Sequence, residues 1–262
     1  MRRKTEGRIV YWISDTVETE RDTLFFLHGL TADHTMFEQQ IRFFDGRFNV
    51  IVWDAPGHGQ SGPDREFTYE EGVNGMRKIA EENGIGRMIL IGQSLGGFFI
   101  QSFLKKYPQM VKAFVSIDST PYGDYYSRSD LWWIGQVEWM ARLYPEKMLK
   151  KAIAKKNALT PAGRENMYSM IAGYPKAQLC HLMGRGYAEF LKENSAVEIH
   201  CPVLLLVGER DCTGKVAAYN KSWAQRTGFP LEWIPGAAHN SNVDQPEIVN
   251  KKILQFVQSL DK

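Results

Sequence analysis

The 262-residue sequence predicts an α/β fold with a mainly parallel central sheet. Short apolar runs alternate with longer helical patterns, which is typical of a parallel sheet covered by helices. Two runs, residues 88–91 and 203–207, consist entirely of Met, Ile, Leu and Val, as expected for strands that are buried on both faces. No strand-like run occurs between about residues 120 and 200, so a helical insertion is expected there.

The individual strands are predicted from the apolar runs and the turn-forming residues that bound them. They cover residues 8–14, 23–27, 48–53, 88–92, 113–118, 203–207 and 231–234. Helical periodicity follows at residues 69–83, 95–107, 216–226 and 247–260. We therefore expect a core formed by residues 1–119 and 201–262, with residues 120–200 inserted between its two parts.

The insertion carries amphipathic patterns at residues 131–143, 146–157 and 164–191. We interpret it as a helical cap, or lid, over the carboxyl end of the sheet. Its many large apolar side chains either line a substrate pocket or pack the cap onto the sheet. The candidate substrate contacts are Trp132, Trp133, Trp139 and Met140, together with His34 from the core.

The charge balance and the cysteines exclude several classes of function. The 32 basic and 30 acidic residues form no stripe or tail, so neither nucleic acid nor a membrane surface is an expected partner. No signal peptide or membrane-spanning run is predicted. Cys180, Cys201 and Cys212 lack metal-ligand spacing, no other ligand cluster predicts a metal, and a reduced cytoplasmic setting is expected.

A candidate nucleophile, Ser94, stands at the centre of a G-x-S-x-G pattern that begins at Gly92 and ends at Gly96. The bare pattern is weak, but here it lies between a predicted buried strand and a predicted helix. On so sharp a turn the serine takes unfavourable backbone angles, and the residues two positions away must be small. The hydroxyl would project above the sheet, beside a helix amino terminus that favours negative charge. The alternative is a glycine-rich turn with an idle serine.

With this motif the chain resembles the α/β hydrolases over nearly its whole length, apart from the insertion. The resemblance implies a nucleophile, an acid and a histidine in that chain order, acting on a small-molecule substrate without a cofactor. It also implies two backbone N–H donors to an oxyanion. On this sequence they belong to Leu95, after the nucleophile, and Leu30, after the His28-Gly29 turn. His28 itself is expected to brace that turn.

His239 is the predicted general base. It follows the last predicted strand, and a loop at the carboxyl end of a strand can bring an imidazole to Ser94. The other five histidines precede the serine, lie in the insertion or stand at the amino end of a strand: His28, His34, His58, His181 and His200.

Asp211 is the predicted acid, because its loop follows the strand at residues 203–207 and resembles the acid loop of the family. A buried carboxylate there would hold the histidine tautomer and stabilise the imidazolium. The next residues, 212–215, depart from the family pattern of an apolar residue and a proline. Two alternatives stay open: Asp118, at the end of the preceding strand, where some family members carry the acid, and Glu209.

Gly57, Gly59 and Gly62 form a literal G-x-G-x-x-G after a strand, which suggests a dinucleotide site. That fingerprint requires the last glycine to open a helix, whereas Pro63-Asp64-Arg65 follows here. The segment instead resembles the D-x-x-G-x-G-x-S loop of the hydrolases.

The sequence therefore predicts a serine hydrolase that cleaves an ester-type bond in a small, largely apolar substrate through an acyl-enzyme intermediate. Fold does not choose among related reactions. Carbon–carbon bond hydrolysis or acyl transfer by the same residues stays open, as does a non-catalytic receptor for a small ligand.

Overall fold

The computed structural model describes residues 1–62 and 67–260 and is centred on an eight-stranded sheet. The strand order is β1-β2-β4-β3-β5-β6-β7-β8. The two pairs at the amino-terminal edge, β1–β2 and β2–β4, are antiparallel, and the pairs from β4 to β8 are parallel. The strands are β1 (Arg2–Glu6), β2 (Ile9–Ile13), β3 (Thr23–Leu27), β4 (Asn49–Trp53), β5 (Met88–Gln93), β6 (Val111–Ile117), β7 (Val203–Gly208) and β8 (Leu231–Ile234).

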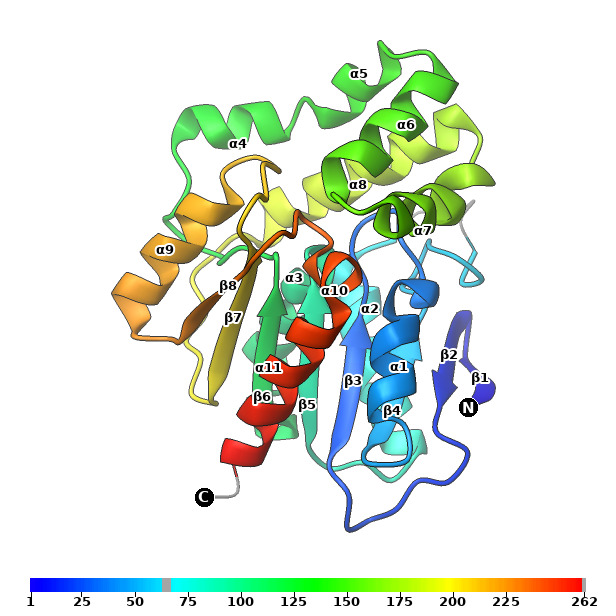
Figure 1. Cartoon of the computed structure of the whole chain (residues 1–262), viewed down its shortest axis with the longest axis vertical. Coiled ribbons are helices and arrows are strands. Elements are labelled where there is room, and N and C mark those ends of the chain that lie inside the picture. Colours follow the sequence, from blue (N-terminus) through cyan, green and yellow to red (C-terminus); the bar gives the residue numbers. More distant parts are fainter. Residues whose placement is uncertain (63–66, 261–262) are drawn as a thin grey trace.

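Helices cover the sheet, as predicted, and they lie on both of its faces. In Figure 1, α1 (Glu38–Phe44) and α11 (Pro246–Ser259) lie in front of the strands, and α2 (Tyr69–Glu82) and α3 (Leu95–Lys106) lie behind them. The other helices are α4 (Arg128–Ile134), α5 (Val137–Arg142), α6 (Glu146–Asn157), α7 (Pro161–Ala172), α8 (Lys176–Glu193), α9 (Val216–Thr227) and α10 (Ser241–Asp244), with short 3-10 turns at His34–Phe37 and Pro108–Met110.

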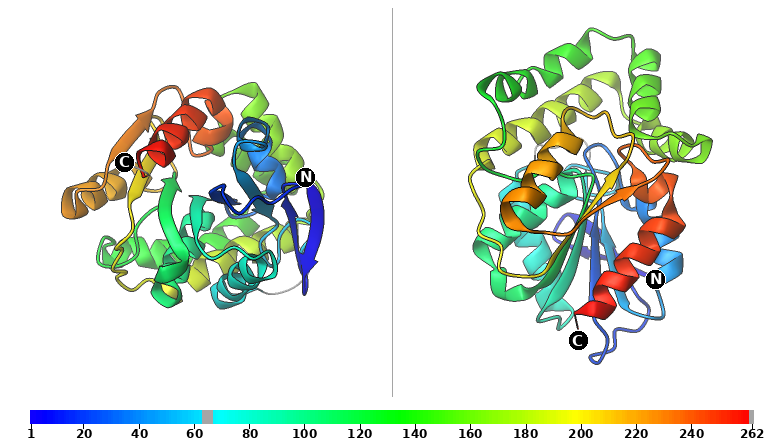
Figure 2. Two further views of the ribbon diagram at one scale, coloured as in Figure 1. Left: turned by 90° about the horizontal axis from the view of Figure 1, so that it is seen from below. Right: turned by 60° about the vertical axis from the view of Figure 1, so that its left-hand side comes forward.

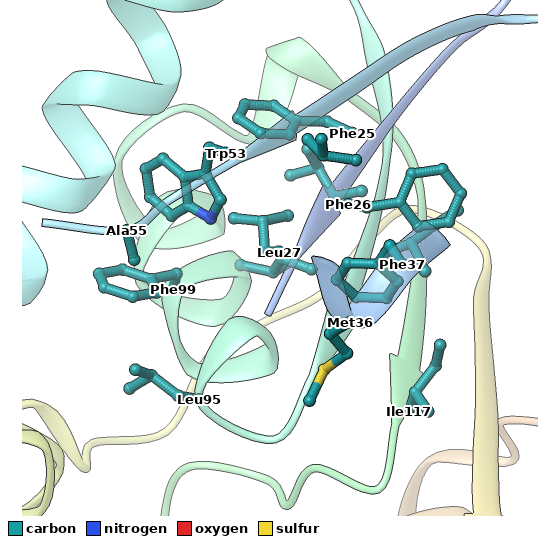
Figure 3. Close-up of a cluster of buried hydrophobic side chains, with 14 of the residues drawn as sticks. Phe25, Phe26, Leu27, Met36, Phe37, Trp53, Ala55, Leu95, Phe99 and Ile117 are labelled. Carbon is teal, nitrogen blue, oxygen red and sulfur yellow. The ribbon is translucent and has the colours of Figure 1, made fainter. Parts of the chain in front are cut away.

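Aromatic side chains fill the core on both faces of β3, which is buried along its whole length. Trp53 of β4 packs edge-on against Phe25 and Phe99, with ring centroids 5.6 and 5.3 Å apart. On the other face Phe26 contacts Phe37 at 5.2 Å. Figure 3 shows this cluster. Burial of such large apolar surfaces is the main stabilising term of the fold and gives β3 and β5 a rigid frame.

Five helices, α4 to α8, join β6 to β7 and form a helical layer beyond the carboxyl ends of the parallel strands (Figures 1 and 2). The predicted boundaries near residues 120 and 200 fall in the segments that connect this layer to the sheet. Asp244 fastens the layer to the core, since its carboxylate accepts N–H groups of Leu159 and Thr160 on one side and of Ala238 on the other. Across the described ranges, none of the helices combines the length and the apolar character needed to cross a membrane.

Three local expectations were wrong. Strand β1 was not predicted, because its sequence is mostly charged and it pairs at an exposed edge. Residues 131–143 form two helices, α4 and α5, instead of one. Residues 164–191 are likewise divided into α7 and α8, because Pro175 disfavours helical angles at Tyr174 and caps α8, which begins at Lys176.

Candidate active site

Ser94 lies at the tip of a tight turn between β5 and α3. Its backbone angles, φ 49° and ψ −112°, belong to a region that residues other than glycine rarely adopt. A Cβ atom on Gly92 would lie 2.5 Å from the backbone of Gly96 and Gly97, and one on Gly96 would collide with the Leu27 carbonyl oxygen. The two glycines therefore allow the close packing of β5, α3 and β3 that holds the serine in this conformation.

Three side chains from distant parts of the chain meet beside this turn. The Nε2 atom of His239 lies 2.9 Å from Ser94 Oγ, and its Nδ1 atom lies 2.8 Å from Asp211 Oδ2. Both distances are those of hydrogen bonds. The structure thus brings together the three residues that the sequence named as base, acid and nucleophile.

The neighbours of His239 and Asp211 fix this geometry. Gln93 donates to the backbone carbonyl of His239 at 2.7 Å, so the residue before Ser94 holds the histidine loop. Asp211 Oδ1 accepts the backbone N–H of Thr213 at 2.7 Å, within the loop that departs from the family pattern. The side chains of His239 and Asp211 are 7% and 0% exposed, so solvent screens their interaction only weakly.

Charge and burial act in opposite directions on the two titrating groups. Burial disfavours the charged imidazole, but the Asp211 carboxylate outweighs it and raises the pKa of His239 above 6.5. Burial likewise disfavours the charged carboxyl, but His239 outweighs it and holds the pKa of Asp211 below its usual value. A hydrogen bond from Nδ1 to Asp211 leaves Nε2 of the neutral ring free to accept the Ser94 proton.

Asp118, the rival acid, has a different set of partners. Its carboxylate accepts the backbone N–H groups of Gly208 at 2.7 Å and of Ser241 at 2.9 Å. Burial and the neighbouring charge of Asp211 raise the pKa of Asp118 to about 8. Glu209, the second rival, is exposed and faces the Gly236 N–H. Asp211 is therefore the carboxylate that contacts the imidazole.

The two predicted oxyanion donors lie on either side of Ser94. Leu95 follows Ser94 as the first residue of α3, and Leu30 and Ser94 line the same cavity. Within residues 1–62 and 67–260, neither backbone N–H donates to a protein oxygen. The preceding His28 has its Nδ1 2.8 Å from the Gly29 carbonyl, and its Nε2 accepts the Ala55 N–H at 2.9 Å, so this ring braces the turn as expected.

Two cavities, with volumes of about 290 and 360 Å³, meet at Ser94 and His239. The first extends between α4, α8 and the acid loop, and the second extends under α5, α6 and α7. Most of the lining is apolar or aromatic. The residues common to both cavities are Ser94, Val137, Met140, Lys156, Tyr187, Thr213 and His239.

A family model described as the alpha/beta hydrolase fold matches residues 22–246. The chain belongs to the α/β-hydrolase family. Among curated relatives, a 2-(acetamidomethylene)succinate hydrolase of Mesorhizobium japonicum is 26% identical over 90% of this chain and 88% of that protein. Carboxylesterase YbfK of Bacillus subtilis is 23% identical over 90% of this chain and 80% of its own length.

Solved structures agree with the fold. A thermophilic esterase from Thermogutta terrifontis superposes with a TM-score of 0.78 at 20% identity, and each chain is covered completely. The chain is thus an α/β hydrolase with a mostly parallel sheet, as the sequence predicted. The sheet has eight strands, one more than expected.

The predicted substrate contacts of this α/β hydrolase fall into two groups. Met140 lines both cavities and Trp133 lines the first. Trp132 and Trp139 line neither cavity at Ser94, and they are 58% and 59% exposed because the short helices α4 and α5 turn them outward. The structure does not bring these two side chains into the cavities at Ser94, and their contact with the substrate stays a prediction.

His34 also lies outside both cavities, so the structure does not bring it to Ser94, and its contact with the substrate stays a prediction. Its ring stacks on Trp12 at 3.5 Å, and its Nδ1 atom lies 2.8 Å from Asp54 Oδ1. The side chains of Asp33, His34 and Asp54 form a group whose atoms that could bind a metal ion lie within 4.8 Å of one another. Since Asp33 caps the turn at Thr35 and Asp54 accepts two backbone N–H groups, these carboxylates are already engaged. The absence of a metal site stays a prediction.

The glycine motif of residues 57–62 lies beside Asp54, whose carboxylate accepts the Gln60 N–H at 2.7 Å. The following Pro63, Asp64 and Arg65 lie outside the described residues. The next described helix, α2, begins only at Tyr69, so it does not start at the last glycine as a dinucleotide site would require.

Sequence reasoning missed four of the residues that line both cavities: Val137, Lys156, Tyr187 and Thr213. Thr213 carried a usable signal, since it lies in the loop that departs from the family pattern. Lys156 is one of five lysines in or next to α6, and no sequence pattern separates it from the others.

Proposed function

We propose that this α/β hydrolase cleaves a carboxylic ester of a small, largely apolar acyl compound, with Ser94 as nucleophile, His239 as general base and Asp211 as its orienting acid. The observation that carries the proposal is the position of His239, whose two ring nitrogens lie within hydrogen-bond distance of Ser94 and Asp211 at the junction of two cavities.

In the first step Ser94 Oγ attacks the ester carbonyl carbon while its proton passes to His239 Nε2. The carbonyl oxygen becomes an oxyanion, which the Leu30 and Leu95 N–H groups stabilise. Each such donor in a dry site lowers the barrier by about 3 kcal/mol. The imidazolium, held by Asp211, then gives its proton to the leaving alcohol, and an acyl-enzyme remains.

In the second step water attacks the acyl carbonyl and His239 accepts its proton. Collapse of the tetrahedral intermediate returns the proton to Ser94 Oγ and releases the carboxylic acid. This reaction uses only side chains, backbone N–H groups and water, so no cofactor is needed.

The helical layer α4 to α8 serves in this proposal as the predicted cap, residues 120–200. It contributes Trp133, Met140 and Tyr187 to the cavity walls. Apolar walls of this kind exclude water and bind the carbon chain of a substrate. A similar role for the cap would also suit acyl transfer by the same residues, which remains the alternative reaction.

The test is covalent labelling with a fluorophosphonate, followed by peptide mapping and turnover of p-nitrophenyl butyrate. We expect the label on Ser94, and we expect Ser94→Ala to abolish labelling and turnover. Ser259→Ala, an exposed serine at the end of α11, is the matched control and should behave as wild type. A label on another residue would refute the proposal.

Saturable ligand binding without turnover would instead support the receptor alternative. Comparison with a vinylogous diketone separates ester hydrolysis from carbon–carbon bond cleavage. We also propose a reduced cytoplasmic setting, which the small number of cysteines supports.

A further inference from the structure

Lys156 is the charged side chain that faces both cavities at the junction where Ser94 lies. It appears in both linings, together with Ser94 and His239. The remaining shared lining is uncharged, with Val137, Met140, Tyr187 and Thr213. A lysine in this place brings a positive charge next to the reacting atoms.

The charge of Lys156 has no counterion in the part of the chain that the structure describes. The other lysine of the first cavity, Lys215, is paired with Asp130 at 2.7 Å. The carboxylate lining that cavity, Asp118, is bound to two backbone N–H groups and does not reach Lys156. The second cavity has no acidic residue among its described lining. Lys156 is exposed, so its ammonium group keeps water while the cavities are empty. A neutral substrate that fills them would remove part of this water without supplying a partner for the charge.

The backbone around Lys156 is fixed relative to the histidine loop. The carbonyl of Asn157, the next residue, accepts the backbone N–H of Asn240 at 2.8 Å, and Asn240 directly follows His239. The clamp of Asp244 on Leu159 and Thr160 holds the same segment a few residues later. The position of Lys156 in the site is thus set by the fold, although its long side chain can adjust.

We propose that Lys156 binds a carboxylate of the substrate, so that the preferred substrate is an acyl ester carrying a free carboxylate near the scissile bond. The inference deepens the proposed ester hydrolysis and rests on it. A carboxylate supplies the counterion that the cavities lack, and its attraction to the ammonium group aligns the carbonyl with Ser94. The positive charge of Lys156 also disfavours protonation of His239, so the electrostatic field of the lysine reaches the imidazole ring.

The experiment compares esters matched in size but different in charge. One pair places the carboxylate on the acyl side, with p-nitrophenyl hydrogen adipate against p-nitrophenyl heptanoate. The other places it on the alcohol side, with 4-acetoxybenzoate against p-tolyl acetate. The variants are Lys156→Gln and, as the matched control, Lys155→Gln, an exposed lysine in the same helix turn that lines neither cavity.

We expect Lys156→Gln to lower kcat/KM on the anionic member of one pair by about tenfold or more, mainly through KM. The loss on the neutral member should be clearly smaller than the loss on the anionic member, and Lys155→Gln should change neither. Equal losses on charged and neutral esters, or no loss on either anionic ester, would overturn the inference while leaving ester hydrolysis intact.

A binding measurement separates the two proposals. In a Ser94→Ala background, the dissociation constant of p-nitrophenyl hydrogen adipate is measured by calorimetry with and without Lys156→Gln. A rise of about tenfold on loss of the lysine supports carboxylate binding even if no ester is turned over. If the ester does not bind, or if its dissociation constant is the same with and without Lys156→Gln, the result counts against carboxylate binding on the acyl side. The same result with 4-acetoxybenzoate would reject the inference as a whole.

Discussion

Two buried carboxylates, Asp118 and Asp211, lie near one imidazole, and their hydrogen bonds give them different tasks. Asp211 faces His239 Nδ1 and is stabilised as an anion by it. Asp118 accepts N–H groups from the end of β7 and the start of α10, and the charge of Asp211 disfavours its own ionisation. Like charges in one low-dielectric site repel, so a single carboxylate carries the charge that orients the base.

We expect Asp211→Asn to lower kcat by about 10³- to 10⁴-fold, since the amide cannot hold the ring in the required tautomer. It should also move the pH profile. Only neutral His239 accepts the Ser94 proton, so kcat/KM falls as pH falls through its pKa, which the carboxylate raises above 6.5. In the variant, burial remains and lowers this pKa, so the acid limb shifts to lower pH. Rates on p-nitrophenyl butyrate across pH measure both effects.

Asp118→Asn is the comparison variant for this prediction. It preserves the contact between His239 and Asp211, and it replaces a carboxyl group whose pKa of about 8 keeps it mostly protonated where the acid limb lies. We therefore expect a smaller shift of the acid limb and a smaller loss of kcat than in Asp211→Asn. A larger loss than in Asp211→Asn would reassign the acid.

The residues that bear on the chemistry were predictable because local motifs mark them. Ser94, His239 and Asp211 each follow a strand in a fixed chain order, and the structure brings them together. The substrate wall was not predictable in the same way. Whether Trp133 or Trp132 faces a cavity depends on the rotation of a seven-residue helix, and rotation follows from packing that the sequence pattern does not encode.

At the scale of elements, the turn from β5 to α3 depends on backbone contacts that are so close that only glycine fits at the two contact positions. Gly96 packs against the Leu27 carbonyl of β3, the strand that leads into the Leu30 turn. The nucleophile and one proposed oxyanion donor are therefore held in register by the same backbone contact. An added methyl group would separate the two elements that the proposed reaction needs together.

We expect Gly96→Ala to destabilise the protein by about 1–3 kcal/mol through this overpacking, and to lower kcat as well. Gly86→Ala is the control, because an added Cβ there meets nothing within 4 Å. Its effect should stay within about 0.5 kcal/mol. Urea unfolding measures both variants, and equal stability of the two would contradict the packing argument.

Elements with strong apolar patterns were predicted closely, and those defined by tertiary pairing were not. The bounds of β3, β8 and α6 match the prediction to the residue. Strand β1 depends on pairing with β2 and carries charged residues, so its sequence gives no strand signal.

At the scale of the whole molecule, the helical layer and the sheet are joined at the site by one buried carboxylate. Asp244 binds the N–H groups of Leu159 and Thr160, between α6 and α7, and the N–H of Ala238, which directly precedes His239. The position of the base is therefore coupled to the layer that covers it. Any change that loosens this clamp should affect stability and catalysis together.

We expect Asp244→Asn to lower the free energy of unfolding by about 1–3 kcal/mol, because an amide nitrogen replaces one acceptor and leaves a buried N–H unpaired. It should also lower kcat, since the backbone before His239 loses its anchor. Asp124→Asn is the control: its side chain is 90% exposed and pairs with Arg226 at the surface, where an ion pair contributes less than about 1 kcal/mol. Thermal unfolding and p-nitrophenyl butyrate turnover are measured on the same samples. Loss of stability with unchanged kcat would show that the layer and the base are held independently, and would limit the clamp to a structural role.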